Sequence, residues 1–157
     1  MTDKATAIHD LELGYQDFRG PLDRLEDDDY GEVWLGNWNL SQLLAHLVGW
    51  YHEMTAAIER VERGERPTPA GVDYSDSDAW NAKFEKDAKP GKAALAEFEK
   101  AFANYLAAAK ALPEDQYGID PEKGRPKIGN RLLEGAGTGH FKEHQGQLDA
   151  WLKTKDD

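Results

Sequence analysis

The sequence predicts an all-α protein, a four-helix bundle with a long connection before the last helix. Apolar residues recur every three or four positions along four stretches of the chain, the spacing of helices that bury one face. No stretch shows the convincing apolar–polar alternation of a half-buried strand. The 157 residues, 39% hydrophobic and 31% charged, suit a globular protein, and we expect one domain over residues 1–157.

The first helix is expected over residues 8–25, where the apolar positions are Ile8, Leu11, Tyr15, Phe18, Leu22 and Leu25. Gly20-Pro21 interrupts this pattern, and a kink is expected there because proline cannot donate a backbone hydrogen bond. A polar loop at 26–30 should end the helix.

The second helix has the clearest pattern and is expected from about Leu40 to Arg63. Asn39 or Asn37 can cap its start, and Gly64 can stop it. Residues 64–75 have the composition of a loop.

Ser75 or Asp76 can cap a third helical stretch, which is broken at 89–91 (Lys-Pro-Gly) and then continues to Leu112. Residues 113–130 contain three prolines and three glycines and should form the long connection. The fourth helix is expected over residues 131–153. Its pattern is interrupted by glycines at positions 135, 137, 139 and 146, each of which weakens a helix.

Histidines mark the candidate site. His140 and His144 are four residues apart on the apolar face of the fourth helix, so their rings lie on one side of it. With His46 from the second helix they can supply three ligands to one metal ion and leave a position open. Imidazole suits Zn, Ni, Fe or Cu. The same pattern also fits histidines at the edge of a core, hydrogen-bonded to polar neighbours, and it leaves both interpretations open.

Two further residues are candidates beside the histidines. Trp50 lies one turn after His46 and can form the wall of a pocket. Glu143 flanks the histidine pair and can act as a hydrogen-bond acceptor behind a ligand or as a general base. His9 and His52 are weaker ligand candidates. The phosphate-binding, nucleophile-elbow and HExxH motifs do not occur in the sequence.

Composition restricts partners and location. The chain carries 19 basic and 30 acidic residues, a net charge of −11, without a basic stripe, and we therefore expect no nucleic-acid partner. The sequence has no apolar run of membrane-spanning length, so no membrane partner is expected either. Cysteine is absent, and the first residues lack the features of a signal peptide; we expect a cytoplasmic protein.

Three segments resemble the DinB-like (damage-inducible) four-helix-bundle superfamily. Residues 38–47 (WNLSQLLAHL) are similar to the start of its second helix, and residues 140–148 (HFKEHQGQL) to its closing helix. Residues 78–81 (DAWN) resemble the asparagine-containing start of its third helix. The resemblance covers roughly residues 8–153. Gln145 stands where arginine is common, a departure that does not affect a ligand position.

The resemblance implies a metal triad of His46, His140 and His144, and related proteins use such a site in thiol-dependent transfer or isomerisation. We therefore expect a divalent transition metal (Zn, Ni or Fe) and a low-molecular-weight thiol as cofactors. The expected function is a metal-dependent transferase or hydrolase that acts on a small molecule, in stress or detoxification. Trp50 and Asn81 are expected to line the substrate pocket, with Glu143 beside them.

Residues 46–52 (HLVGWYH) and 71–74 (GVDY) also resemble the branch that contains a colibactin self-protection hydrolase. This leaves two alternatives: a metal-independent hydrolase of that type, and a protein that binds or sequesters a small molecule without turnover. The five tryptophans exceed what a small bundle readily buries, and we therefore expect a homodimer, although the charge of −11 opposes self-association.

Overall fold

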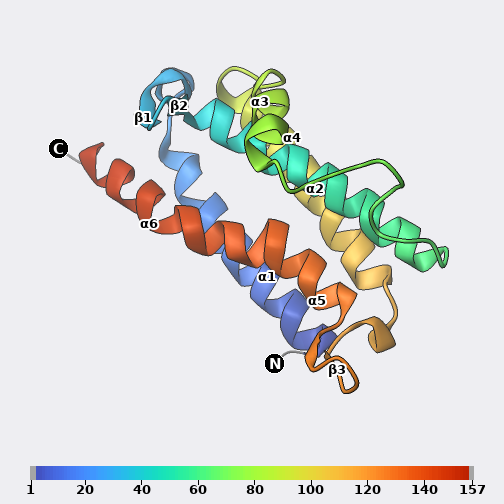
Figure 1. Cartoon of the computed structure of the whole chain (residues 1–157). Coiled ribbons are helices and arrows are strands. Elements are labelled where there is room, and N and C mark those ends of the chain that lie inside the picture. The colour runs from blue at the N-terminus through green and yellow to red at the C-terminus, as the bar shows by residue number, and fades with distance from the viewer. Residues whose placement is uncertain (1–2, 156–157) are drawn as a thin grey trace. The chain divides into compact units, whose positions relative to one another are not determined.

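Helices make up most of the protein in the computed structural model, which describes residues 3–155 (Figure 1). The chain forms two compact units. The terminal unit comprises the residues up to Arg24 together with those from Ala108 onward, and the central unit comprises Leu25–Ala107.

The terminal unit begins with α1 (Lys4–Arg19), which starts where the Asp3 carboxylate accepts a hydrogen bond from the Thr6 N–H at 2.9 Å. The expected interruption at Gly20-Pro21 is the 3₁₀ turn η1 (Gly20–Arg24). The later elements of this unit are η3 (Glu114–Gln116), the hairpin of β3 (Ile119–Asp120) and β4 (Arg125–Pro126), α5 (Ile128–Leu133), the π-helical turn η4 (Glu134–Thr138) and α6 (Gly139–Thr154).

Helix α1 packs against α5 and α6, which follow one another end to end alongside it in Figure 1. The contact is close at Gly14, where an added Cβ atom would lie 2.9 Å from the Phe141 ring. Phe141 also packs on Phe18, with 5.5 Å between ring centroids, and both side chains are buried. Gly14 on α1 thus makes room for Phe141, which lies between His140 and His144 in the sequence.

The central unit contains η2 (Asp27–Gly31), the hairpin of β1 (Val33–Leu35) and β2 (Trp38–Asn39), α2 (Leu40–Glu62), α3 (Ser77–Glu85) and α4 (Gly91–Ala111), whose last turn belongs to the terminal unit. Asn39 caps α2 as expected: its side chain accepts from the Gln42 N–H, and the Gln42 side chain accepts from the Asn39 N–H, both at 2.9 Å. Gly64, with φ +79°, follows the end of α2.

Helix α2 contacts α4 through aromatic rings and α3 through a glycine. Tyr51 stacks on Tyr105 with centroids 5.1 Å apart and the ring planes 15° from parallel. On another side of α2, the Phe84 ring of α3 lies over Gly49 so closely that an added Cβ atom would be 2.2 Å from it. Gly49 therefore sets how closely α3 approaches α2.

Two local expectations are wrong. Residues 26–30, expected as a polar loop, include the 3₁₀ turn η2, and Tyr30 in it is fully buried. Within residues 3–155 the chain also forms two short hairpins where no strand was expected, since strands of two or three residues are too short to show alternation. The turn η2 has a tertiary role: Asp27 accepts from the Lys92 N–H at 3.0 Å and caps α4.

Within residues 3–155, none of the helices is both long enough and apolar enough to cross a membrane.

Replacing Gly49 by alanine should destabilise the protein by about 1–3 kcal/mol, because the methyl group overlaps the Phe84 ring. Urea denaturation followed by circular dichroism measures this. Gly20→Ala is the matched control, since Gly20 has φ −53° and no atom within 4 Å of the added Cβ. In a Phe84→Ala background the Gly49→Ala cost should shrink; an undiminished cost there would contradict the overlap.

The Tyr117 hydroxyl should make stability fall at high pH. It donates to the Ala109 carbonyl at 2.7 Å, near the end of α4, and burial raises its pKa to about 12. Since the unfolded pKa is about 10, the stabilisation is complete below about pH 10 and is lost between about pH 10 and 12. Tyr117→Phe should lower the free energy of unfolding by about 1 kcal/mol at pH 7 and flatten the alkaline decline. Equal alkaline slopes in both proteins would refute this assignment.

Candidate functional site

His46 is fixed by two side chains of the central unit. Its imidazole is only 5% exposed, and its Nδ1 lies 2.7 Å from the Asn81 side-chain oxygen. The Trp50 indole N–H donates to the same oxygen at 3.0 Å. Because an indole can only donate, this Asn81 atom is an acceptor for both rings. A neutral His46 ring that bonds to this oxygen donates from Nδ1, which leaves the lone pair on Nε2.

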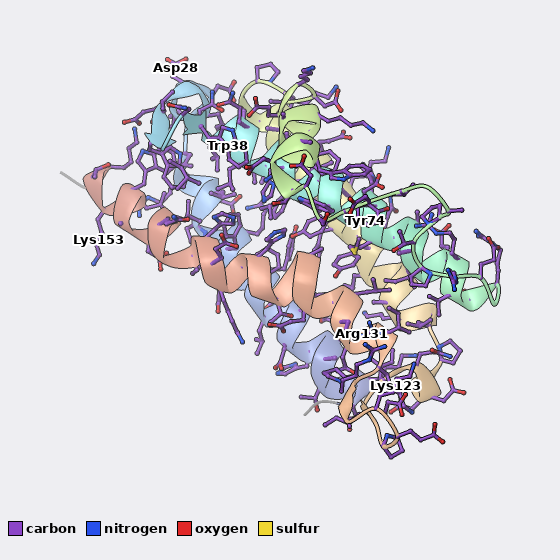
Figure 2. All side chains as sticks on the ribbon, viewed as in Figure 1. Asp28, Trp38, Tyr74, Lys123, Arg131 and Lys153 are labelled. Carbon is purple, nitrogen blue, oxygen red and sulfur yellow. The ribbon has the colours of Figure 1, made fainter. Side chains whose placement is uncertain are left out.

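Trp38 confines the His46 ring from a second direction. The two ring centroids are 5.2 Å apart with the planes at 44°, and the Trp38 indole N–H donates to the Glu85 carboxylate at 2.5 Å. Figure 2 shows Trp38 beside the start of α2. Asn81 and Glu85 are four residues apart on α3, so one face of this helix accepts from both indoles and from His46.

An aromatic cluster of Trp50, Tyr74, Trp80 and Phe84 adjoins this site, with ring centroids 4.9–6.0 Å apart. Tyr74 belongs to the loop before α3 and donates to Glu53 at 2.9 Å, and the Trp80 indole donates to the Asp73 carbonyl at 2.7 Å. Figure 2 shows Tyr74 beside the middle of α2. These contacts hold the loop against α2 next to Trp50.

The other two histidines lie together in the terminal unit. The His140 and His144 ring centroids are 6.0 Å apart on α6, and His144 is 8% exposed. The Nδ1 of His140 lies 3.0 Å from the Ala136 carbonyl, and the Nδ1 of His144 lies 2.9 Å from the Gln147 side-chain oxygen. In its neutral form, an imidazole that faces an oxygen acceptor at Nδ1 donates to it, and its Nε2 then carries the lone pair.

The acceptor for His140 arises from the π-helical turn before α6. The Gly139 N–H bonds to the Glu134 carbonyl five residues back, and α6 then resumes the four-residue spacing from the Thr138 carbonyl. Ala136 belongs to this turn, and its carbonyl oxygen lies 3.0 Å from the His140 Nδ1.

The electrostatics keep His140 neutral. Burial lowers its pKa, and the neighbouring His144 lowers it further. The hydrogen bond to Ala136 and the charge of Glu143 act in the opposite direction without reversing the shift. An imidazole whose pKa lies below its ordinary value is deprotonated at neutral pH, which is the form that binds metals.

Three of the remaining candidate residues, Glu143, His9 and His52, have exposed side chains. Glu143 is exposed on α6, and His9 is exposed on α1. His52 is exposed on α2 and, with Glu53, lines a cavity of about 340 Å³ within the central unit that does not include His46. Asn81, expected as a pocket residue, holds His46 and Trp50.

The three histidines divide between the units: His46 lies in the central unit, and His140 and His144 lie in the terminal unit. Across residues 3–155, neither unit by itself holds three His, Asp or Glu side chains grouped to bind one metal ion. The metal triad therefore stays a prediction.

Sequence reasoning missed the acceptors of the two α6 histidines. The sequence analysis assigned no role to Gln147, and the position of the Ala136 carbonyl depends on a backbone irregularity. The glycines at 135, 137 and 139 were the sequence signal for an irregular helix at this point. Irregularities such as π-helical turns often lie at functional sites.

A model of the DinB superfamily matches residues 10–148 of this chain. The chain belongs to the DinB superfamily. Among proteins with curated descriptions, none matches the sequence.

Solved structures of DinB-like proteins share the fold. The colibactin self-resistance protein ClbS is similar at a TM-score of 0.79 and 15% identity, over 96% of this chain and 95% of that one. The Sibling Lethal Factor Precursor DfsB is similar at 0.78 and 15%, over 99% and 98%. A mycothiol-dependent maleylpyruvate isomerase is similar at 0.70 and 19%, over 94% of this chain and 63% of that one. The predicted all-α fold of the DinB-like type is confirmed.

The expectation that excluded nucleic acid is wrong. ClbS, a protein of this fold, was crystallised in complex with a double-stranded DNA. Contact with phosphates depends on where lysine and arginine side chains lie on the surface, and the net charge of −11 does not describe their placement. The charge of the chain therefore gives no ground for excluding a DNA partner.

Replacing Gly139 by alanine should destabilise the protein by about 1–3 kcal/mol and disturb the His140 ring, because an added Cβ atom would lie 2.5 Å from the Glu134 carbonyl oxygen. Denaturant unfolding and the His140 NMR signals measure the two effects. Gly146→Ala is the matched control on the same helix: no atom lies within 4 Å of its Cβ, so it should gain up to about 1 kcal/mol. Equal stabilities of the two variants would disprove the role of Gly139.

Proposed function

We propose that this DinB-superfamily protein is a metal-dependent enzyme that acts on a small molecule together with a low-molecular-weight thiol. The proposed ligands are His46, His140 and His144, each through Nε2. The observation that carries the proposal is the hydrogen bonding of the three rings: each has an oxygen acceptor at Nδ1. Histidines that bind metals usually donate their other ring N–H in this way.

The residues fit a divalent transition metal. Neutral imidazole is a good ligand for Zn, Ni and Fe, and the lowered pKa of His140 keeps this ring neutral at pH 7. Three protein ligands leave a coordination position for water or substrate, the pattern of catalytic sites. Bound there, a divalent metal supplies a Lewis acid that lowers the pKa of a water or thiol at that position.

The chain's own residues have supporting roles in this proposal. Asn81, Ala136 and Gln147 hold the three rings in the tautomer that offers Nε2. The aromatic cluster at Trp50 gives the His46 side of the site an apolar wall. Glu143, exposed on α6, is a candidate proton acceptor for a substrate near His140.

The thiol in this proposal is supported by the similarity of the fold to the mycothiol-dependent isomerase. The similarity of the fold to the colibactin self-resistance protein ClbS supports a self-protection role. The metal-independent hydrolase is the alternative of this kind. The cavity of about 340 Å³ favours the second alternative, binding of a small molecule without turnover, because it lies in the size range of ligand pockets.

The protein should bind about one equivalent of a divalent metal when it is purified without a nickel column. Each of His46→Ala, His140→Ala and His144→Ala should weaken zinc binding more than about 100-fold, beyond the effect of losing a supporting hydrogen bond. His52→Ala is the matched control, since His52 is an exposed histidine of the same helix α2. Metal analysis and titration against a competing chelator measure these effects, and circular dichroism verifies the fold. Less than a tenth of an equivalent, with no uptake on titration, would refute the metal site.

A screen of low-molecular-weight thiols with electrophilic small molecules, read by mass spectrometry, tests catalysis. The proposal expects product with the metal-loaded protein and none with the triple His→Ala variant. Product from the triple variant would favour the metal-independent hydrolase. Saturable binding without product would favour the binding protein.

A further inference from the structure

We propose that Asn81 is the positioning residue of His46, which it holds with the proton on Nδ1 and the lone pair on Nε2. Only the consequence for metal affinity rests on the proposed function; the tautomer does not. Nothing in the sequence resemblance assigned this role, which rests on three atoms of the central unit: the His46 Nδ1, the Asn81 side-chain oxygen and the Trp50 indole nitrogen.

Trp50 fixes the orientation of the Asn81 amide. The indole N–H has no acceptor function, so the amide atom it meets at 3.0 Å is the oxygen of Asn81. If the amide were rotated by half a turn, its NH₂ group would face the indole N–H and lose this bond. The oxygen that Trp50 fixes lies 2.7 Å from the His46 Nδ1 and requires a donor there. Trp50 thereby determines the tautomer of His46 through Asn81.

Asn81 is itself held on a rigid element. Helix α3 begins at Asp76, whose side chain accepts from the Ala79 N–H at 3.2 Å, and its Phe84 ring packs over Gly49 of α2. Glu85 on the same face accepts from Trp38, whose ring packs against His46 at 5.2 Å. The His46 imidazole is therefore restrained by Asn81 at one edge and by the Trp38 ring.

Positioning and simple packing predict different results. If Asn81 only filled space, an apolar residue of similar size would preserve the tautomer of His46. If it positions the ring, a replacement must keep an oxygen acceptor. Asn81→Leu removes the acceptor at similar volume, and Asn81→Asp keeps it. Glu85→Gln is the matched control, because it alters the neighbouring acceptor on α3, which serves Trp38 and not His46.

The first measurement needs no metal. Long-range ¹H–¹⁵N NMR of metal-free protein at pH 8 identifies which imidazole nitrogen is protonated, and the His46 signals are those lost in His46→Gln. Wild type, Asn81→Asp and Glu85→Gln should show the Nδ1–H tautomer. Asn81→Leu should show a mixture or the Nε2–H form. A wild-type Nε2–H tautomer, or an unchanged tautomer in Asn81→Leu, would overturn the proposal.

Trp50→Phe provides an independent variant should Asn81→Leu fail to fold. It keeps Asn81 but removes the donor that fixes the amide, so the amide can rotate and His46 should show both tautomers. A single Nδ1–H tautomer in Trp50→Phe would show that Trp50 does not determine the tautomer of His46 through Asn81.

The second measurement is zinc affinity against a competing chelator. Asn81→Leu should bind zinc 10–100-fold more weakly than wild type, the usual effect of losing an acceptor behind a histidine ligand. Asn81→Asp should bind at least as tightly as wild type, and Glu85→Gln should match it. Unchanged affinity in Asn81→Leu would overturn the functional consequence. Absence of zinc binding in wild type would instead defeat the proposed metal site, and the tautomer experiment would still decide the role of Asn81.

Discussion

A buried imidazole needs a hydrogen-bond acceptor for its one N–H, and much of the local structure around this site serves that need. Leaving a buried polar group without a partner costs about 1–3 kcal/mol. His46 is met by Asn81, His140 by the Ala136 carbonyl and His144 by Gln147. The three acceptors differ in kind: two are side-chain amides and one is a backbone carbonyl. They share one consequence, since each leaves the lone pair on Nε2.

In the central unit, helix α3 supplies the hydrogen-bond acceptor for His46. The nine-residue helix is too short to be stable alone, so its position comes from contacts. Phe84 occupies the space left by Gly49, the loop before α3 is tied to α2 through Tyr74 and Glu53, and Asp76 caps the first turn. These contacts bring Asn81 to His46. Helix α3 thus positions the acceptors Asn81 and Glu85, and its apolar residue Phe84 fixes the helix against α2.

In the terminal unit the same requirement is met by the backbone. A regular helix uses its internal carbonyls in its own ladder. The turn at Glu134–Thr138 is π-helical, and the carbonyl of Ala136 within it lies beside the His140 Nδ1. The absence of a side chain at Gly139 permits the close approach of the Glu134 carbonyl. Gly139, one of the glycines that interrupt the fourth helical pattern, therefore has a structural role in the irregular turn that precedes His140.

The sequence by itself predicted the four main helical stretches and several of their ends. Apolar spacing located α1, α2, α4 and α6, and Asn39, Asp76 and Gly64 marked boundaries that depend only on neighbouring residues. It also singled out the three histidines. It did not determine their hydrogen-bond partners, because Asn81 lies 35 residues from His46. The turn η2 and the hairpins were missed because Tyr30 is buried by distant residues and the strands are too short for a pattern. Local propensity is encoded in adjacent residues, whereas the acceptor of a buried ring is set by the packing of whole helices, which only the tertiary structure decides.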